Sequence, residues 1–227
     1  MAKKFEGNLD LFNLHLTELP FNVLNGLHVT GYFNCNNNRL KSLIGSPKIV
    51  DGSFNCFDNK LTSLEGMTQF IGGVIDVSYN KLISLKGCPE KLNDGFDCSH
   101  NRLTTLVGGP EYVEGAFFIR YNNLTSLVGS PSIVTGNFNC GDNNLISLEG
   151  SPKHIYKTFN CNHNNLTSLI NAPEYIGVNF SCNDNKLTSL EGAPKIVNGD
   201  FHCYNNSVKF TEEQVRAVCD VKGKVYV

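Results

Sequence analysis

The sequence predicts a solenoid in which stacked coils form a continuous parallel β-sheet along one face and turns along the opposite face. Three observations support this fold class: a period of 21 residues, an alternation of apolar and polar positions within each period, and a Gly-x-Pro signal that closes most periods. A repeat of this length is a single structural unit that buries its apolar face only by stacking on its neighbours.

A column of Phe-x-Cys pairs sets the 21-residue period, which continues without insertion or deletion. Aromatic or aliphatic side chains two residues apart are typical of a strand with one buried face. We therefore expect the pair to point inward and the residues between and just after it to point outward. The pairs are Phe33/Cys35, Phe54/Cys56, Ile75/Val77, Phe96/Cys98, Phe117/Ile119, Phe138/Cys140, Phe159/Cys161, Phe180/Cys182 and Phe201/Cys203.

An asparagine column follows three residues after the Cys position in all nine regular repeats. A buried bending backbone needs hydrogen-bond partners, and an amide side chain both donates and accepts. We expect these side chains to turn inward and bond to adjacent coils, a structural role. The column consists of Asn38, Asn59, Asn80, Asn101, Asn122, Asn143, Asn164, Asn185 and Asn206.

The return side of each coil carries glycine and then proline two residues later, as in Gly45 and Pro47. Glycine tolerates positive φ and proline excludes a long helix, so this side should consist of turns and polyproline-like segments. Asn171 replaces the glycine once, and asparagine is the next-best residue for positive φ.

The two ends depart from the repeat, as expected for coils with only one neighbour. Residues 1–28 are interpreted as an N-terminal cap coil, 29–206 as the regular repeats and 207–227 as a C-terminal cap. Thr211 and Gln214 form a capping-box pattern that predicts a short helix to about Cys219, with Val215 and Val218 facing the core. Residues 222–227 are expected to form a turn and an edge strand.

The repeat pattern, a strand followed by x-x-Asn-x-Leu-x-x-Leu, resembles the leucine-rich-repeat family over about residues 7–208. It is closest to the short bacterial type with a Leu-Pro-rich return, and segments such as Leu187-Thr-Ser-Leu-Glu-Gly also look like proteins of bacteriophages and large viruses. The resemblance implies a solenoid with its sheet on the concave face. It also implies a viral protein that acts in the cytoplasm of a bacterial host.

Composition narrows the function classes. The net charge is -2, which gives no reason to expect nucleic acid or an anionic membrane as partner. The start has no apolar signal region, and no apolar run approaches the roughly 20 residues of a membrane span, so we expect a cytoplasmic protein. The nine cysteines include no CxxC pair, and Val77 and Ile119 share their column, so reduced, buried thiols are favoured over disulfides or zinc.

The outward columns point to a protein-binding patch in the middle of the chain, because aromatic residues and arginine are enriched at binding hot spots. Phe118 stands in a column that is otherwise polar, and an exposed large apolar group is informative. Asp58 adds a further flanking carboxylate. The predicted partner-binding residues are Phe57, Tyr79, His100, Phe118, Arg120 and Tyr121, with Asp76 and Asp97 beside them.

The sequence thus predicts a monomeric, non-catalytic module that binds a protein partner and needs no cofactor. No nucleophile elbow, P-loop or dinucleotide fingerprint is present, which argues against an enzyme. One alternative is a structural or adhesion spacer of a larger particle. Another is a ligand- or metal-binding protein that uses the column of Asp142, His163 and Asp184, for which a solvated polar face is the simpler explanation.

Overall fold

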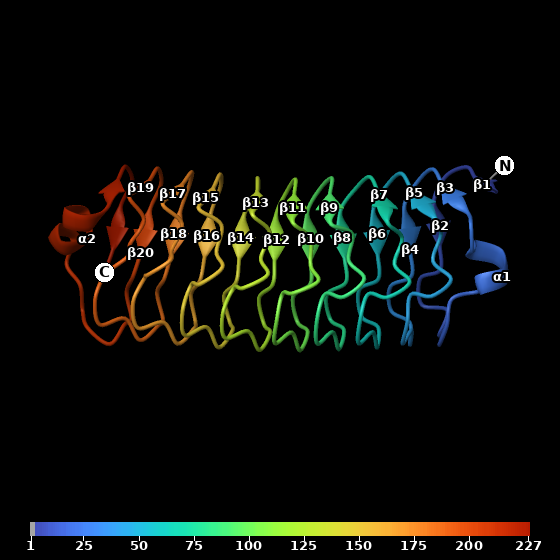
Figure 1. Cartoon of the computed structure of the whole chain (residues 1–227), viewed down its shortest axis with the longest axis horizontal. Helices are drawn as coiled ribbons and strands as arrows, with labels where there is room; N and C mark the ends of the chain where they lie inside the picture. Colours follow the sequence, from blue (N-terminus) through green and yellow to red (C-terminus); the bar gives the residue numbers. More distant parts are fainter. Residues whose placement is uncertain (1–2) are drawn as a thin grey trace.

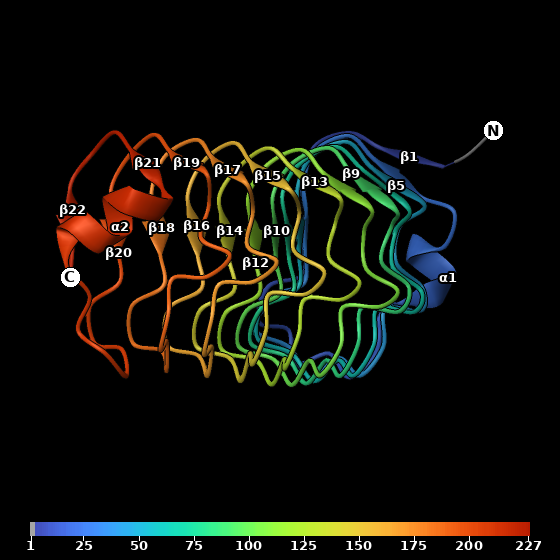
Figure 2. The ribbon, with the colours of Figure 1, turned by 60° about the vertical axis from the view of Figure 1, so that its left-hand side comes forward.

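The computed structural model describes residues 3–227 as a row of stacked coils with the two termini at opposite ends (Figures 1 and 2). Within these residues the main sheet has eleven short parallel strands, one from each successive coil. They are β2 (Leu9–Asp10), β4 (Phe33–Asn34), β6 (Phe54–Asn55), β8 (Ile75–Asp76), β10 (Phe96–Asp97), β12 (Phe117–Phe118), β14 (Phe138–Asn139), β16 (Phe159–Asn160), β18 (Phe180–Ser181), β20 (Phe201–His202) and β22 (Val225–Tyr226).

From β4 to β20, each strand of the main sheet pairs with the next at the 21-residue register that the period predicts, whereas the two end pairs, β2 with β4 and β20 with β22, are offset by 24 residues. Phe96 lies opposite Phe117 and Asp97 opposite Phe118, a step of one repeat. The phenylalanine and cysteine columns are buried along the whole stack, and successive rings contact one another, as Phe117 and Phe138 do with centroids 5.4 Å apart. Each buried ring contributes on the order of 1.5–3 kcal/mol before entropy is subtracted.

A second ladder of parallel strands, which we did not predict, runs beside the main sheet. It forms on the aliphatic column four residues before each Phe position, and its inward residues, such as Val113 and Val134, are buried. One part comprises β1 (Lys4–Phe5), β3 (His28–Val29), β5 (Ile49–Val50) and β7 (Phe70–Ile71). The other comprises β9 (Lys91–Leu92), β11 (Tyr112–Val113), β13 (Ile133–Val134), β15 (His154–Ile155), β17 (Tyr175–Ile176), β19 (Ile196–Val197) and β21 (Asp220–Val221).

The asparagine column points inward and joins adjacent coils, as predicted. Asn59 Nδ2 donates to the carbonyl of Cys35 in the preceding coil at 3.0 Å and to that of Cys56 in its own coil at 3.3 Å. Its Oδ1 accepts from the Leu40 amide at 3.0 Å. The same contacts recur along the stack, so one side chain per coil satisfies backbone groups that the bend would otherwise leave unpaired.

The predicted turn at the glycine column is confirmed. Gly45 has φ 94°, and Asn171, the one replacement in that column, has φ 68°. The Cβ of any residue placed at Gly150 would overlap the Leu127 carbonyl oxygen, so close packing of the preceding coil also requires glycine there.

The C-terminal end is covered by helix α2 (Glu212–Val218), which starts with the predicted capping box of Thr211 and Gln214. Val215 is fully buried, but the expectation that Val218 also faces the core is wrong, because its side chain is 50% exposed. Cys219 is buried instead. A residue four positions along a helix lies closer to the same face than one three positions along, given 3.6 residues per turn.

The N-terminal end contains α1 (Phe21–Leu24), a single helical turn after Pro20 that the sequence patterns did not indicate. The side chains of Phe12, Leu14 and Val23 remain at least half exposed in this first coil. The last strand, β22, pairs with β20 as the edge strand expected near the C-terminus.

All nine cysteines are free thiols, and eight are buried. Burial raises the pKa of the thiols, for example that of Cys203 to about 11, which keeps them protonated and unreactive.

No helix within residues 3–227 combines the length and the apolar character needed to cross a membrane.

Candidate protein-binding face

A left-handed backbone position recurs two residues after each Cys position, just beyond each strand of the main sheet. Asparagine, aspartate and histidine are the non-glycine residues most often found in this conformation. They occupy it in seven coils, whereas tyrosine occupies it in two. This left-handed column consists of Asn37, Asp58, Tyr79, His100, Tyr121, Asp142, His163, Asp184 and Asn205, with φ between 49° and 55°.

Four aromatic side chains from successive coils form a continuous stack on the outer face of the main sheet. Phe57 meets Tyr79 edge-on, with ring centroids 5.1 Å apart. Tyr79 stacks on His100 at 4.1 Å, and His100 stacks on Tyr121 at 4.2 Å. We name Phe57, Tyr79, His100 and Tyr121 the aromatic ladder. Tyr79 is 48% and Tyr121 42% exposed, so the ladder presents its rings to solvent.

Arg120 closes the C-terminal end of the ladder. Its guanidinium lies 4.6 Å from the centre of the Tyr121 ring and donates to the Tyr121 hydroxyl at 3.1 Å. The same Nη2 donates to Asp142 at 3.1 Å. A guanidinium held by a ring and a carboxylate keeps a defined orientation, so this end of the ladder is preorganised.

A shallow depression of about 350 Å³ opens beside the ladder, with Phe118 half-buried in its lining. Ser99, only 4% exposed, also lines it, and its hydroxyl has no hydrogen-bond partner within the described residues. The buried Nε of Arg120 is likewise unpaired there. Unsatisfied buried polar groups are rare, and both of these belong to residues that line the depression.

Two groups on this face have shifted pKa values. Asp76 and Asp97 lie opposite each other on adjacent strands. Burial raises the pKa of the Asp76 carboxyl, and hydrogen bonds from Ser78 act in the opposite direction. Burial also lowers the pKa of His100, and the nearby Arg120 charge adds to this effect. The middle rung of the ladder is thus held neutral near pH 7.

The structure brings the predicted patch residues together on one surface. The six aromatic, histidine and arginine residues lie in four neighbouring coils, and the two aspartates adjoin them. The sequence patterns did not reveal that three of the four ladder residues, Tyr79, His100 and Tyr121, occupy a left-handed column. The run of Asn and Asp at Asn37, Asp58, Asp142, Asp184 and Asn205 was the available signal for positive φ. Sequence analysis also treated Ser78 and Ser99 as outward, but both are buried.

The column of Asp142, His163 and Asp184 is engaged in contacts of its own. Asp142 is paired with Arg120, and Asp184 accepts hydrogen bonds from Asn205 at 3.0 Å and Asn183 at 2.6 Å. In residues 3–227 no group of three or more His, Cys, Asp or Glu side chains is placed to hold a metal ion. The geometry gives this column no ligand site of its own.

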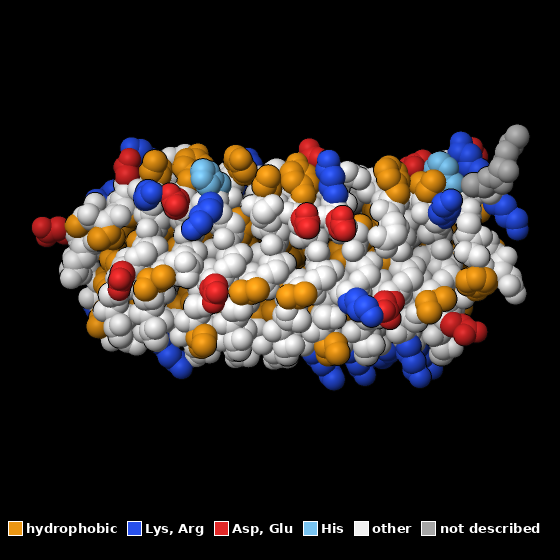
Figure 3. Space-filling view, in the orientation of Figure 1, with side chains coloured by type: hydrophobic (Ala, Val, Ile, Leu, Met, Phe, Trp, Pro, Cys, Tyr) orange, Lys and Arg blue, Asp and Glu red, His pale blue; other side chains and the backbone are white. Residues whose placement is uncertain are grey.

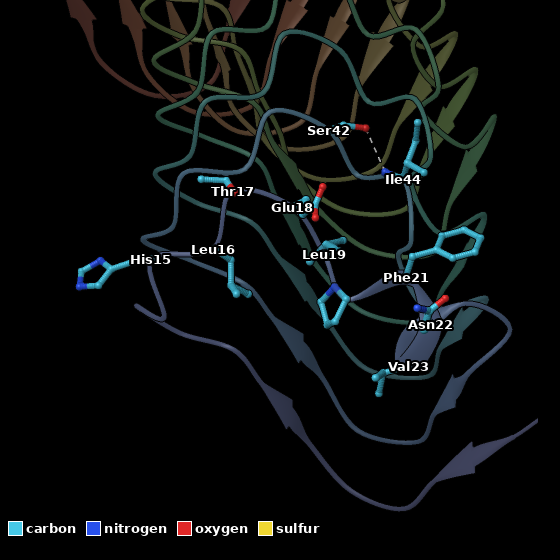
Figure 4. A pocket seen from close by; sticks show the side chains of 11 residues that line it. His15, Leu16, Thr17, Glu18, Leu19, Phe21, Asn22, Val23, Ser42 and Ile44 are labelled. Atoms are coloured by element: carbon cyan, nitrogen blue, oxygen red, sulfur yellow. Dashed lines mark hydrogen bonds between the residues drawn. The ribbon is translucent and has the colours of Figure 1, made fainter.

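A larger depression, about 890 Å³, lies at the N-terminal end of the stack (Figure 4). Leu16, Leu19, Phe21 and Ile44 contribute much of its lining. These side chains belong to the irregular first coil and its neighbour, so the hollow marks where the regular stack ends.

The paired coils, the inward asparagine column and the constant 21-residue step define this protein as a leucine-rich-repeat solenoid. The structure is similar to that of YopM from Yersinia enterocolitica WA-314, with a TM-score of 0.59 and 20% sequence identity. The similarity covers 95% of this chain and 50% of the YopM chain, so this chain spans about half of that length. No protein-family model and no curated protein matches the sequence.

Proposed function

We propose that this protein is a non-catalytic module that binds a protein partner through the aromatic ladder and the depression beside it. The observation that supports this most directly is the presence of Tyr79 and Tyr121 in the left-handed column, which all the other regular coils fill with asparagine, aspartate or histidine. Deviations from a local preference that the rest of a structure respects are typical of functional sites.

Stabilisation of the fold does not explain why aromatic residues form the ladder. A left-handed backbone costs roughly 1–2 kcal/mol for an ordinary side chain, and less for asparagine. Each stacked aromatic pair returns about 0.5–1.5 kcal/mol. The two effects are of similar size, so the fold gains little. What the rings supply is a rigid, exposed aromatic surface, which binds with little loss of conformational entropy.

The free thiols support a reducing compartment, and we place the protein in the cytoplasm. The resemblance of the repeats to bacteriophage proteins suggests that this is the cytoplasm of an infected bacterium. The module is proposed to act as a monomer, with its partner on the outer face of the main sheet.

Affinity capture from bacterial lysate tests this proposal. The bait is wild-type protein, compared with the triple variant Phe118→Ala, Arg120→Ala and Tyr121→Ala. A partner that uses the ladder should be retained by wild type and lost from the variant, and calorimetry with the purified partner should show at least about a hundredfold weaker binding.

The matched control alters the same three columns two coils further on, as Asn160→Ala, Asn162→Ala and His163→Ala. It should bind the partner as wild type does. Equal binding by the ladder variant and the wild type would remove the ladder from the interface and, with it, this proposal.

A further inference from the structure

A row of basic side chains lies two residues beyond the left-handed column in four successive coils, three of which carry Phe57, Tyr79 and His100 of the aromatic ladder. We name Arg39, Lys60, Lys81 and Arg102 the basic row; all four side chains are exposed. Coils repeat about 4.8 Å apart, and two residues span at most about 7 Å, so row and ladder are adjacent. Figure 3 shows Lys and Arg side chains gathered along one long edge of the molecule, over its N-terminal half.

The backbone holds the basic row in register. The Lys60 amide donates to the Leu40 carbonyl at 2.9 Å, and the Arg102 amide donates to the Leu82 carbonyl at 2.9 Å. Lys81 repeats the contact one coil earlier, with its amide 2.8 Å from the Leu61 carbonyl oxygen. The four cationic residues are therefore a regular array fixed by the coil geometry.

This array is not neutralised within the protein. Among residues 3–227, the ion pairs that form involve other lysines and arginines, such as Lys86 with Glu65, and none involves the basic row. Like charges on neighbouring coils repel one another. The same position in later coils holds Asn123, Asn144 and Asn165, then Lys186 and Ser207, so the repeat does not require a cation there.

The opposite flank of the ladder is acidic. Asp76 and Asp97 lie three residues before Tyr79 and His100, on the strands of the main sheet. The face is thus divided across the ladder, with carboxylates on one side and cations on the other. A nucleic acid, with a phosphate at every nucleotide, would meet the carboxylate pair as well as the cations. A protein surface can place acidic groups on one edge alone.

We propose that the basic row receives an acidic segment, rich in Asp and Glu, of the protein that binds the aromatic ladder. This inference rests on the proposed function and specifies the chemistry of the partner. Exposed ion pairs contribute modestly to affinity individually and raise the association rate together. The row therefore selects and orients the partner, while the ladder holds it.

A labelled oligoglutamate peptide tests the row without the natural partner. About eight residues suffice, because an extended chain advances roughly 3.3 Å per residue and so exceeds the length of the row. Fluorescence anisotropy at low ionic strength should show binding that weakens as salt is added. The variant Arg39→Gln, Lys60→Gln, Lys81→Gln and Arg102→Gln should bind about tenfold more weakly.

The matched control removes four exposed lysines away from the row, as Lys48→Gln, Lys91→Gln, Lys153→Gln and Lys195→Gln, and should retain wild-type binding. Equal losses in both variants would show general attraction to a polyanion and overturn the inference. Binding of an oligothymidylate of equal length as tightly as the peptide would also overturn it, in favour of nucleic acid.

A ladder variant separates this inference from the proposed function. Tyr79→Asn, His100→Asn and Tyr121→Asn keep the basic row and restore residues that suit the left-handed backbone. Oligoglutamate binding that survives in this variant supports the row as an independent acidic-segment site. Capture of the natural partner by the same variant would refute the role of the ladder and leave the row standing.

Discussion

The central and C-terminal coils share one framework and differ in what they display. In both regions the main sheet, the asparagine column and the left-handed position have the same geometry. At that position the central coils carry Tyr79, His100 and Tyr121, whereas the later coils carry Asp142, His163 and Asp184. The framework therefore keeps its geometry with different side chains at this position, and the outer face is the variable part of the molecule.

The two regions also differ in whether the polar groups of the outer face have hydrogen-bond partners. In the later coils, polar residues of the outer face bond to their own column, as Asn205 does to Asp184 at 3.0 Å. In the central coils the corresponding surface leaves the Ser99 hydroxyl and the Arg120 Nε unpaired. Polar side chains of the C-terminal face thus bond to one another, whereas two buried polar groups of the central face lack a partner within the described residues.

The largest effect is expected where the two regions are alike. Asn122→Ala and Asn164→Ala each remove an amide that bonds three carbonyls and accepts from a buried leucine amide. Each should lower the free energy of unfolding by about 2–4 kcal/mol, because buried groups are left unpaired. Urea unfolding monitored by circular dichroism measures the free energy of unfolding of both variants. A large difference between the losses in Asn122→Ala and Asn164→Ala would show that the framework is not uniform.

Extending the ladder into the next coil should have a smaller effect. Asp142→Tyr places an aromatic residue in the left-handed position and removes the carboxylate that holds Arg120 at 3.1 Å. We expect a loss of about 1–2 kcal/mol in the free energy of unfolding, again from urea titration. Asp142→Asn, which suits the backbone, is the control and should stay within about 0.5 kcal/mol of wild type. An unchanged stability of Asp142→Tyr would mean that aromatic residues cost nothing here, which would weaken the functional argument.

The smallest effect concerns the protonation of His100. Its pKa lies below the usual 6.5 because of burial and, secondarily, the Arg120 charge. As pH falls below 6.5, the unfolded chain binds the proton first, so the folded state loses stability until the pH is below the folded-state pKa.

NMR titration of the His100 ring protons measures this shift. Arg120→Gln should move the pKa upward, since it removes one of the two causes. The His100→Gln variant should not show this loss of stability below pH 6.5 when its acid unfolding is compared with that of wild type. A His100 that titrates at or above its usual pKa would show that the stack is not formed as described.

Much of the framework could be predicted because it repeats. Residues that recur at one position of each repeat allowed three features to be predicted: the buried Phe-x-Cys pairs, the inward amides and the positive φ at Asn171. The second ladder was not predicted, since each of its strands has at most one buried residue, such as Val50, and a single buried column shows no alternation. The helix Phe21–Leu24 lies in the irregular first coil, where no column guides the reading.

The candidate site was predicted only in outline. Columns indicated which residues share a face, but they carry no information on how rings are oriented. The stacking of His100 between Tyr79 and Tyr121 depends on the left-handed backbone, which aims these side chains along the stack. The unpaired Ser99 hydroxyl follows from the packing of its neighbours, and that packing is a property of three dimensions.

The buried cysteine column gives almost every coil its own reporter of local opening. Cys35, Cys98, Cys161 and Cys203 are spread along the stack, each inaccessible and held as an unreactive thiol while its coil is closed. A thiol reagent can modify such a group only after that segment unfolds, so the rate of modification at each cysteine follows the opening of one coil. The chain is thereby equipped for mapping how a linear array frays from its ends, without any engineered label.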